Sequence, residues 1–129
     1  MVAVDTNVLI RLVVADHTAQ AARAAAVFRS GPLFIAKSVL LEAEWVLRYS
    51  YELGADAILR SLQAVLGLEN VAVEDPKSVT GALRLFERGL DFADALHIAS
   101  SAQAERFVTL DARLVKRARR ASTLEVAGA

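Results

Sequence analysis

The sequence lacks cysteine, contains only the histidines His17 and His97, and carries no formal net charge, with 15 basic and 15 acidic residues. Without cysteine there can be no disulfide, thiolate metal site or thiol nucleophile. Two histidines are too few for a histidine-rich metal centre. The balanced charge argues against a protein that binds nucleic acid through general basicity, although it does not exclude local basic patches.

Long apolar runs are also missing, since no uncharged stretch approaches the ~20 residues that a membrane-spanning helix needs. We therefore expect a cytoplasmic protein with no membrane partner. Hydrophobic residues make up 55% of the chain and charged residues 23%, a composition that predicts a packed core. The length of 129 residues predicts a single domain, 1–129.

Short apolar or β-branched runs alternate with longer helical patterns along the chain, which predicts an α/β fold with a parallel sheet. Strands are predicted at Val2–Val4, Leu33–Ala36, Asn70–Val73, Arg106–Leu110 and Thr123–Val126. Helices are predicted at Asn7–Val14, Thr18–Arg29, Ser38–Tyr51, Ala55–Leu66, Pro76–Arg88, Phe92–Gln103 and Ala112–Arg119.

Two aspartates occupy positions where a parallel sheet places its ligands, and a third could reach the same edge from the start of a helix. Asp5 follows the first predicted strand, which reads as buried, and Asp111 follows the fourth; Asp94 lies in the first turn of a helix. Ligands of open parallel sheets bind beyond the carboxyl ends of the strands. The alternative is that Asp5 and Asp111 only cap helices, and that Asp91 and Asp94 form a capping box.

Two glutamates lie on the helix predicted after the second strand. Glu42 has Trp45 and Val46 one turn away, a stripe that reads as buried, where an unpaired carboxylate would be costly. Glu44 has Arg48 four residues on, the spacing of a solvated ion pair. This pattern favours Glu42 as the functional acid, although leucines also flank Glu44.

A group of several carboxylates without a soft ligand is suited to only a few kinds of chemistry. Like charges close together repel unless a cation compensates them. All-oxygen ligand sets suit Mg²⁺ or Mn²⁺, and the chemistry that follows is metal-assisted attack of water on a phosphodiester.

Four segments in order, "VDTNVL", "SVLLEAEWVL", "DFADALHIA" and "FVTLDARL", resemble the PIN domain, and more narrowly the VapC-type toxins of type II toxin–antitoxin pairs. The resemblance runs from Val2 to about Val115. It implies a PIN-like three-layer fold, with a central parallel sheet of about five short strands flanked by helices. It also implies an endoribonuclease that uses one or two Mg²⁺ or Mn²⁺ ions.

The resemblance assigns roles to individual residues. The four catalytic and metal-binding acids it implies are Asp5, Glu42, Asp94 and Asp111. Asp91 matches a position that is often acidic and is a candidate helper for a second ion. The polar positions implied to support the acids are Thr6, Asn7 and Thr109.

The implied partners are an RNA substrate, a cognate antitoxin protein and a second copy of the chain in a homodimer. Five basic residues follow Asp111, and Arg113, Lys116 and Arg117 are candidates for contacts to the RNA backbone. The alternative is that cations are favoured near a helix C-terminus. Apolar surface for protein partners could come from "AVFRSGPLFI" or from Tyr49 and Tyr51.

Other functions fit less well. A non-catalytic PIN-like scaffold that binds RNA or protein is the main alternative to a nuclease. A phosphate-receiving signalling domain would need paired acids after the first strand and a late lysine, which the sequence lacks. His97, three residues after Asp94, is favoured as a half-buried structural histidine over an active-site contact.

Overall fold

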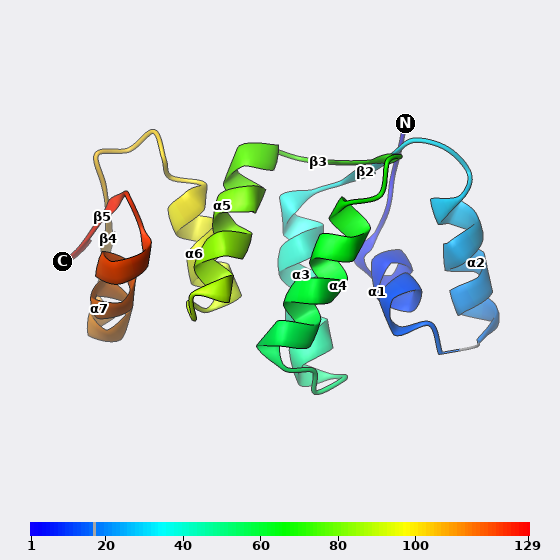
Figure 1. The fold of residues 1–129 in the computed structure, drawn as a ribbon, viewed down its shortest axis with the longest axis horizontal. Helices are drawn as coiled ribbons and strands as arrows, with labels where there is room; N and C mark the ends of the chain where they lie inside the picture. Colours follow the sequence, from blue (N-terminus) through cyan, green and yellow to red (C-terminus); the bar gives the residue numbers. More distant parts are fainter. Residues whose placement is uncertain (17) are drawn as a thin grey trace. The chain divides into compact units, whose positions relative to one another are not determined.

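The computed structural model describes residues 1–16 and 18–129, so His17 lies outside the described residues. Figure 1 shows the chain coloured along the sequence, in which successive strands are separated by one or two helices. The elements are β1 (Val2–Ala3), α1 (Thr6–Val14), α2 (Ala19–Phe28), β2 (Leu33–Ile35), α3 (Lys37–Tyr49), α4 (Ala55–Leu66), β3 (Val71–Val73), α5 (Pro76–Glu87), α6 (Phe92–Ala99), β4 (Arg106–Thr109), α7 (Ala112–Ala121) and β5 (Glu125–Gly128).

The predicted α/β class and its parallel strands are confirmed. The described strands form two parallel sheets, one of order β1-β2-β3 and one made of β4 and β5, instead of one sheet of about five strands. The chain divides into two compact units, Met1–Glu74 and Asp75–Ala129. Each sheet belongs to one of these units, and each unit is described by itself below.

In the first unit, β2 is the middle strand, and Leu33 and Ile35 on it are fully buried. The edge strand β1 pairs with β2 in parallel, Val2 opposite Leu33. Val2 is 57% exposed, so the prediction that the first strand is buried is wrong there, because an edge strand has one neighbour. Val4 is buried, and its N–H donates to the carbonyl of Phe34 at 3.2 Å, which brings the chain to the sheet edge just before Asp5.

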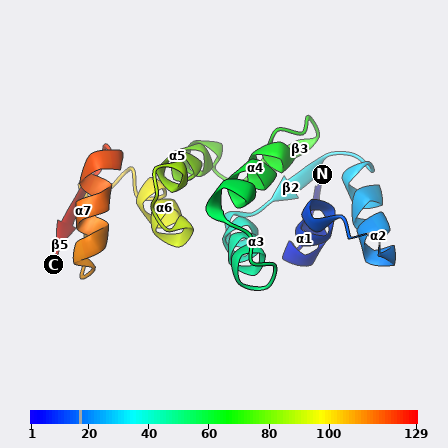
Figure 2. The same cartoon turned by 60° about the horizontal axis from the view of Figure 1, so that its bottom comes forward.

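The helices of this unit form its core by packing on one another and on the sheet. Helix α1 contacts α2 and α3, α3 contacts α4, and α4 contacts β3. Figure 2 shows α1 beside α2 and α3 beside α4 in a second orientation. The residues that α3 buries are Leu40, Ala43, Glu44 and Leu47. This buried face, and not the stripe of Trp45 and Val46, holds α3 in the unit.

In the second unit, α7 packs on both β4 and β5, and α5 packs on α6. Phe86 and Phe92 join α5 to α6 edge to face, with ring centroids 5.4 Å apart, a favoured aromatic geometry. Between these helices Gly89 has a φ of +101°, which only glycine adopts without strain. The turn therefore ends α5 and delivers the chain to Asp91 at the start of α6.

Candidate functional site

Asp5 is held at the start of α1 by a backbone hydrogen bond. The N–H of Thr6 donates to its Oδ1 at 2.7 Å, so the prediction that Asp5 caps a helix is confirmed. The cap fixes the carboxylate at the carboxyl end of β1 while its second oxygen has no hydrogen bond within the described part of the chain. Capping therefore does not compete with a binding role for this residue.

A pocket of about 340 Å³ brings Asp5 and Glu42 together within the first unit. Both acids line it, one from the start of α1 and the other from α3. The remaining lining residues are Thr6, Asn7, Ile10, Arg11, Val46 and Tyr51. Two carboxylates and a buried hydroxyl thus border one space, since Thr6 is only 6% exposed.

The burial of the two glutamates is opposite to the prediction. Glu44 is 2% exposed, and its carboxylate is paired with Arg48 through Nε to Oε2 at 2.9 Å and Nη2 to Oε1 at 3.1 Å. Glu42 is exposed, on the outer face with Trp45 and Tyr49. The inference that Glu44 is solvated is therefore wrong, because α3 buries the stripe through Leu40 and Leu47. The position of Glu42 beside Asp5 supports its candidacy on other grounds.

In the second unit, Asp94 lies in a group of charged side chains. Partial burial raises the pKa of the Asp94 carboxyl, the negative charges of Asp91 and then Asp111 raise it further, and His97 lowers it. Electrostatic effects of this kind need groups close together. His97 is exposed, so the favoured prediction of a half-buried histidine is wrong, and its charge acts on Asp94.

Two acids of this group also cap helices. Asp91 accepts the N–H of Asp94 through Oδ2 at 3.3 Å at the start of α6. Asp111 begins α7, and its Oδ1 accepts the N–H groups of Arg113 at 2.9 Å and Leu114 at 3.2 Å. The hydroxyl oxygen of Thr109 accepts the N–H of Asp111 at 3.0 Å. Local backbone bonding therefore orients Asp111 at the end of β4.

The basic residues of α7 divide into two kinds. Arg117 donates through Nη1 to the carbonyl of Gly89 at 3.4 Å, close to the C-terminus of α5, which agrees with the alternative interpretation of the basic run. Outside this run, Arg88, which follows α5, donates to the carbonyl of Ala121 at 2.9 Å. Arg113 and Lys116 are exposed and make no hydrogen bond or ion pair to another described residue through their side chains, so they are available to a ligand.

The donor chemistry of both acid groups fits a hard divalent ion. Their carboxylate oxygens are the ligands that Mg²⁺ and Mn²⁺ prefer, and Mg²⁺ needs only one or two carboxylates. Neither unit contains, among the residues that the structure describes, a group of three or more His, Cys, Asp or Glu side chains that could hold a metal ion. Each acid group is thus suited to supply part of an ion's ligands, with water or substrate oxygens as the remainder.

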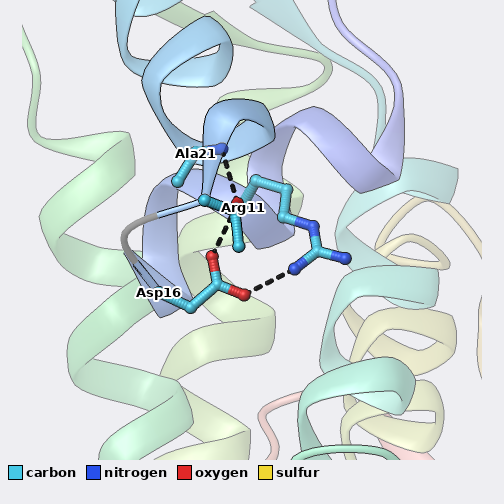
Figure 3. A network of polar contacts seen from close by, with 4 residues as sticks. Arg11, Asp16 and Ala21 are labelled. Carbon is cyan, nitrogen blue, oxygen red and sulfur yellow. Dashed lines mark hydrogen bonds and ion pairs between the residues drawn. The ribbon is translucent and has the colours of Figure 1, made fainter.

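Sequence reasoning missed two polar residues of the first unit. Glu74 follows β3, and its Oε1 accepts the N–H of Lys37 at 2.9 Å, so an acid 37 residues away caps α3. Arg11 lines the acidic pocket and forms an ion pair with Asp16 (Figure 3). A signal for Arg11 was present, because it lies one turn after Asn7 on the helix that Asp5 begins.

The family model of the PIN domain matches residues 2–120, which covers most of the sequence and runs through both units. The chain belongs to the PIN domain family, whose members are generally metal-dependent nucleases that use Mg²⁺ or Mn²⁺. A search among curated proteins returned no match. None of the helices in the described part of the chain is both long and apolar enough to cross a membrane.

Proposed function

We propose that the chain is a metal-dependent endoribonuclease and the toxin of a type II toxin–antitoxin pair. The observation that carries the proposal is that the acids of the PIN motifs gather within each unit. Asp5 and Glu42 line one pocket, and Asp94 lies in the electrostatic range of Asp111. We assign these four residues as metal ligands of a single PIN-like domain, 1–129, with Asp91 as a helper for a second ion.

Each assigned residue has a defined task in RNA hydrolysis. The carboxylates of Asp5, Glu42, Asp94 and Asp111 would hold one or two Mg²⁺ or Mn²⁺ ions, which would supply an activated water and stabilisation of the leaving oxygen. The chain's own task is to hold the carboxylates in place, which the N–H of Thr6 does for Asp5 and the N–H groups of Arg113 and Leu114 do for Asp111. The hydroxyl oxygen of Thr109 accepts the backbone N–H of Asp111 and so fixes the backbone at this residue. Asn7 borders the same pocket as Asp5 and can donate to a phosphate oxygen. In-line attack leaves a 5′-phosphate and a 3′-hydroxyl.

The proposed partners follow from the same assignment. RNA is the substrate in the cytoplasm, with Arg113, Lys116 and Arg117 as backbone contacts. An antitoxin and a second copy of the chain are the protein partners. Apolar surface for them is available on α3, where Trp45 is 54% and Tyr49 60% exposed and their ring centroids are 5.1 Å apart.

A non-catalytic scaffold that binds RNA or protein is the second candidate. The observation that favours it is that no group of three or more metal-ligating side chains occurs among residues 1–16 and 18–129. A scaffold of this kind would bind RNA without cutting it and would not need a divalent ion.

Cleavage of a structured and an unstructured RNA by the purified chain tests the proposal. We expect cutting with Mg²⁺ or Mn²⁺, none with EDTA, and 5′-phosphate ends at the cut sites. Isothermal titration of Mn²⁺ into the metal-free chain measures binding independently of activity. RNA binding with neither metal binding nor cutting would contradict the nuclease and support the scaffold.

A further inference from the structure

A second pocket of the first unit borders the acidic one. It has a volume of about 320 Å³ and is lined by side chains of α1 and α2. Its polar lining residues are Asn7, Arg11, Gln20 and Arg23. Two cations and two amides therefore face this space, and among the described residues no carboxylate lines it. A lining of this chemistry suits an anion with several acceptor oxygens.

The two pockets share part of their walls. Asn7 and Arg11 line both of them. These residues are four apart on α1, so they lie on the same side of the helix, ~6 Å from each other along its axis. The two pockets therefore share this part of α1 as a common wall, and one extended ligand can contact both.

Arg11 is anchored by a chain of hydrogen bonds (Figure 3). Its Nη1 contacts Oδ2 of Asp16 at 2.6 Å, and Oδ1 of Asp16 accepts the hydroxyl of Thr18 at 3.0 Å. Thr18 in turn accepts the N–H of Ala21 at 3.1 Å and caps α2. The guanidinium is thus held by one of its nitrogens, and its other N–H groups make no hydrogen bond to any residue in 1–16 or 18–129.

Arg23 is the uncompensated charge of this pocket. Its side chain is exposed and has no ion pair or hydrogen bond with any residue that the structure describes. Asp16 balances Arg11, whereas nothing in the described lining balances Arg23. The pocket therefore carries net positive charge next to a pocket that carries negative charge.

We propose that this pocket binds a backbone phosphate of the RNA, next to the phosphate that is cut. The assignment rests on the proposed function, which places the cut phosphate at Asp5 and Glu42. Guanidinium groups bind phosphate through paired N–H donors, and backbone contacts fix the register of a strand without reading its bases. Arg23 and Arg11 thereby set which phosphodiester lies at the acids.

A scan with single methylphosphonate linkages tests this assignment. Each linkage in a short single-stranded RNA removes the charge of one phosphate, and affinity is measured by fluorescence anisotropy on Asp5→Asn, which is expected not to cut. We expect one linkage position to weaken binding to this protein. Adding Arg23→Gln should weaken binding of the unmodified RNA about tenfold, the size of one charge-assisted contact, and remove sensitivity at that position alone.

The salt dependence of binding gives a second readout. Loss of one phosphate contact should make the slope of log affinity against log salt shallower by about 0.7 for a single strand. Arg29→Gln is the matched control, because Arg29 ends the same helix, is exposed and lies outside the pocket. If Arg29→Gln behaved like Arg23→Gln, or if Arg23→Gln kept the same sensitive position, the phosphate pocket would be disproved.

The outcomes separate the pocket from the nuclease. A wild-type chain that binds RNA through Arg23 but never cuts it would contradict the proposed function and keep the pocket. A chain that cuts RNA, but in which no phosphate contact depends on Arg23, would support the proposed function and disprove the pocket. If Arg23→Gln left RNA affinity unchanged and weakened binding of a polyglutamate peptide, the occupant would be an acidic protein segment and the RNA assignment would be wrong.

Discussion

The two acid groups of the chain differ in the charge that surrounds their carboxylates. In the first unit, Asp5 and Glu42 share their pocket with Arg11. In the second unit, Asp94 is repelled by Asp91 and Asp111, and His97 only partly offsets this. A carboxylate whose pKa is raised by neighbouring negative charges gains most from an added cation. Under the proposed nuclease function, we expect the second group to contribute more of the affinity for an ion, and the first group to contribute more to the placement of the RNA.

The largest expected effect is on catalysis. Asp5→Asn and Asp94→Asn should each lower the rate of RNA cleavage by at least ~100-fold, since even groups that only orient metal ligands are worth 10–100-fold. If both groups serve one reaction, the double variant should be no slower than the slower single variant. Single-turnover cleavage by the three proteins measures this.

Asp75→Asn is the control for these variants. Asp75 caps α5 as Asp5 caps α1, and asparagine caps as well as aspartate. Cleavage by Asp75→Asn should match the wild type. Additive losses in the double variant of Asp5 and Asp94 would mean that the two groups act independently.

The next largest effect is expected on stabilisation by a metal ion, which should differ between the two acid groups. An ion that binds only the folded chain raises the free energy of unfolding by about 2.7 kcal/mol at 100 times its Kd. The Asp111→Asn variant should lose more of this stabilisation by Mn²⁺ than the Glu42→Gln variant. Asp111 belongs to the second acid group, whose negative charges are only partly offset by His97. Thermal unfolding with Mn²⁺ and with EDTA measures the difference. Equal losses would contradict the division of roles inferred above.

A smaller effect is expected on stability within α3. Glu44→Gln should lower the free energy of unfolding by about 1–3 kcal/mol, less than the cost of breaking a fully buried pair because Arg48 is 37% exposed. The exposed Glu42→Gln should change it by less than about 0.5 kcal/mol but reduce cleavage. Urea unfolding and cleavage of both variants test this. The reverse pattern would mean that Glu42 is the structural acid and Glu44 the functional one.

The smallest effect concerns pH. The pKa of Asp94 is higher in the folded chain than in the unfolded one, so ionisation of Asp94 costs folding free energy once the pH exceeds the unfolded pKa. Without metal, Asp94→Asn should be less stable or equal below that pKa and gain on the wild type as the pH rises through the folded pKa. The gain should stay below about 1 kcal/mol because Asp94 is only partly buried and solvent screens its charge. Urea unfolding from pH 3.5 to 7 checks the sign.

The origin of the shift can be tested separately. Asp111→Asn keeps a capping side chain but removes one of the charges that oppose ionisation of Asp94. The carboxyl of Asp94, followed by carbon NMR, should then titrate at a lower pH than in the wild type. An unchanged midpoint would show that the second group is not electrostatically coupled.

Most of the secondary structure could be predicted from the local sequence. Every predicted helix and strand has a counterpart in the structure, and the predicted caps at Asp5 and Asp111 are confirmed, because caps depend on neighbours within four residues. The predicted end of α6 at Gln103 is wrong. The helix ends at Ala99, and the hydroxyl of Ser101 donates to the carbonyl of His97 at 2.7 Å. Such a side-chain bond competes with the backbone bonds of the helix, and the spacing of apolar residues gives no indication of it.

The ion pair predicted between Glu44 and Arg48 is present, but burial was predicted less well, because it depends on residues distant in sequence. Both α1 and α4 pack on α3 and cover the face of Glu44, whereas the flanking leucines within α3 gave only a weak indication of this. The cap that Glu74 gives Lys37 is equally distant. The pocket at Arg23 needs α1 and α2 side by side, so composition alone gave no sign of it.

The caps at Asp5 and Asp111 also limit how these side chains could coordinate an ion. In each, all the backbone bonds of the cap fall on Oδ1. A carboxylate held in this way offers one oxygen outward, so it is suited to monodentate coordination. Ca²⁺ often takes bidentate carboxylates and six to eight ligands, whereas Mg²⁺ requires a compact octahedron. The same bonds that start two helices thus favour the smaller ion before any ion arrives.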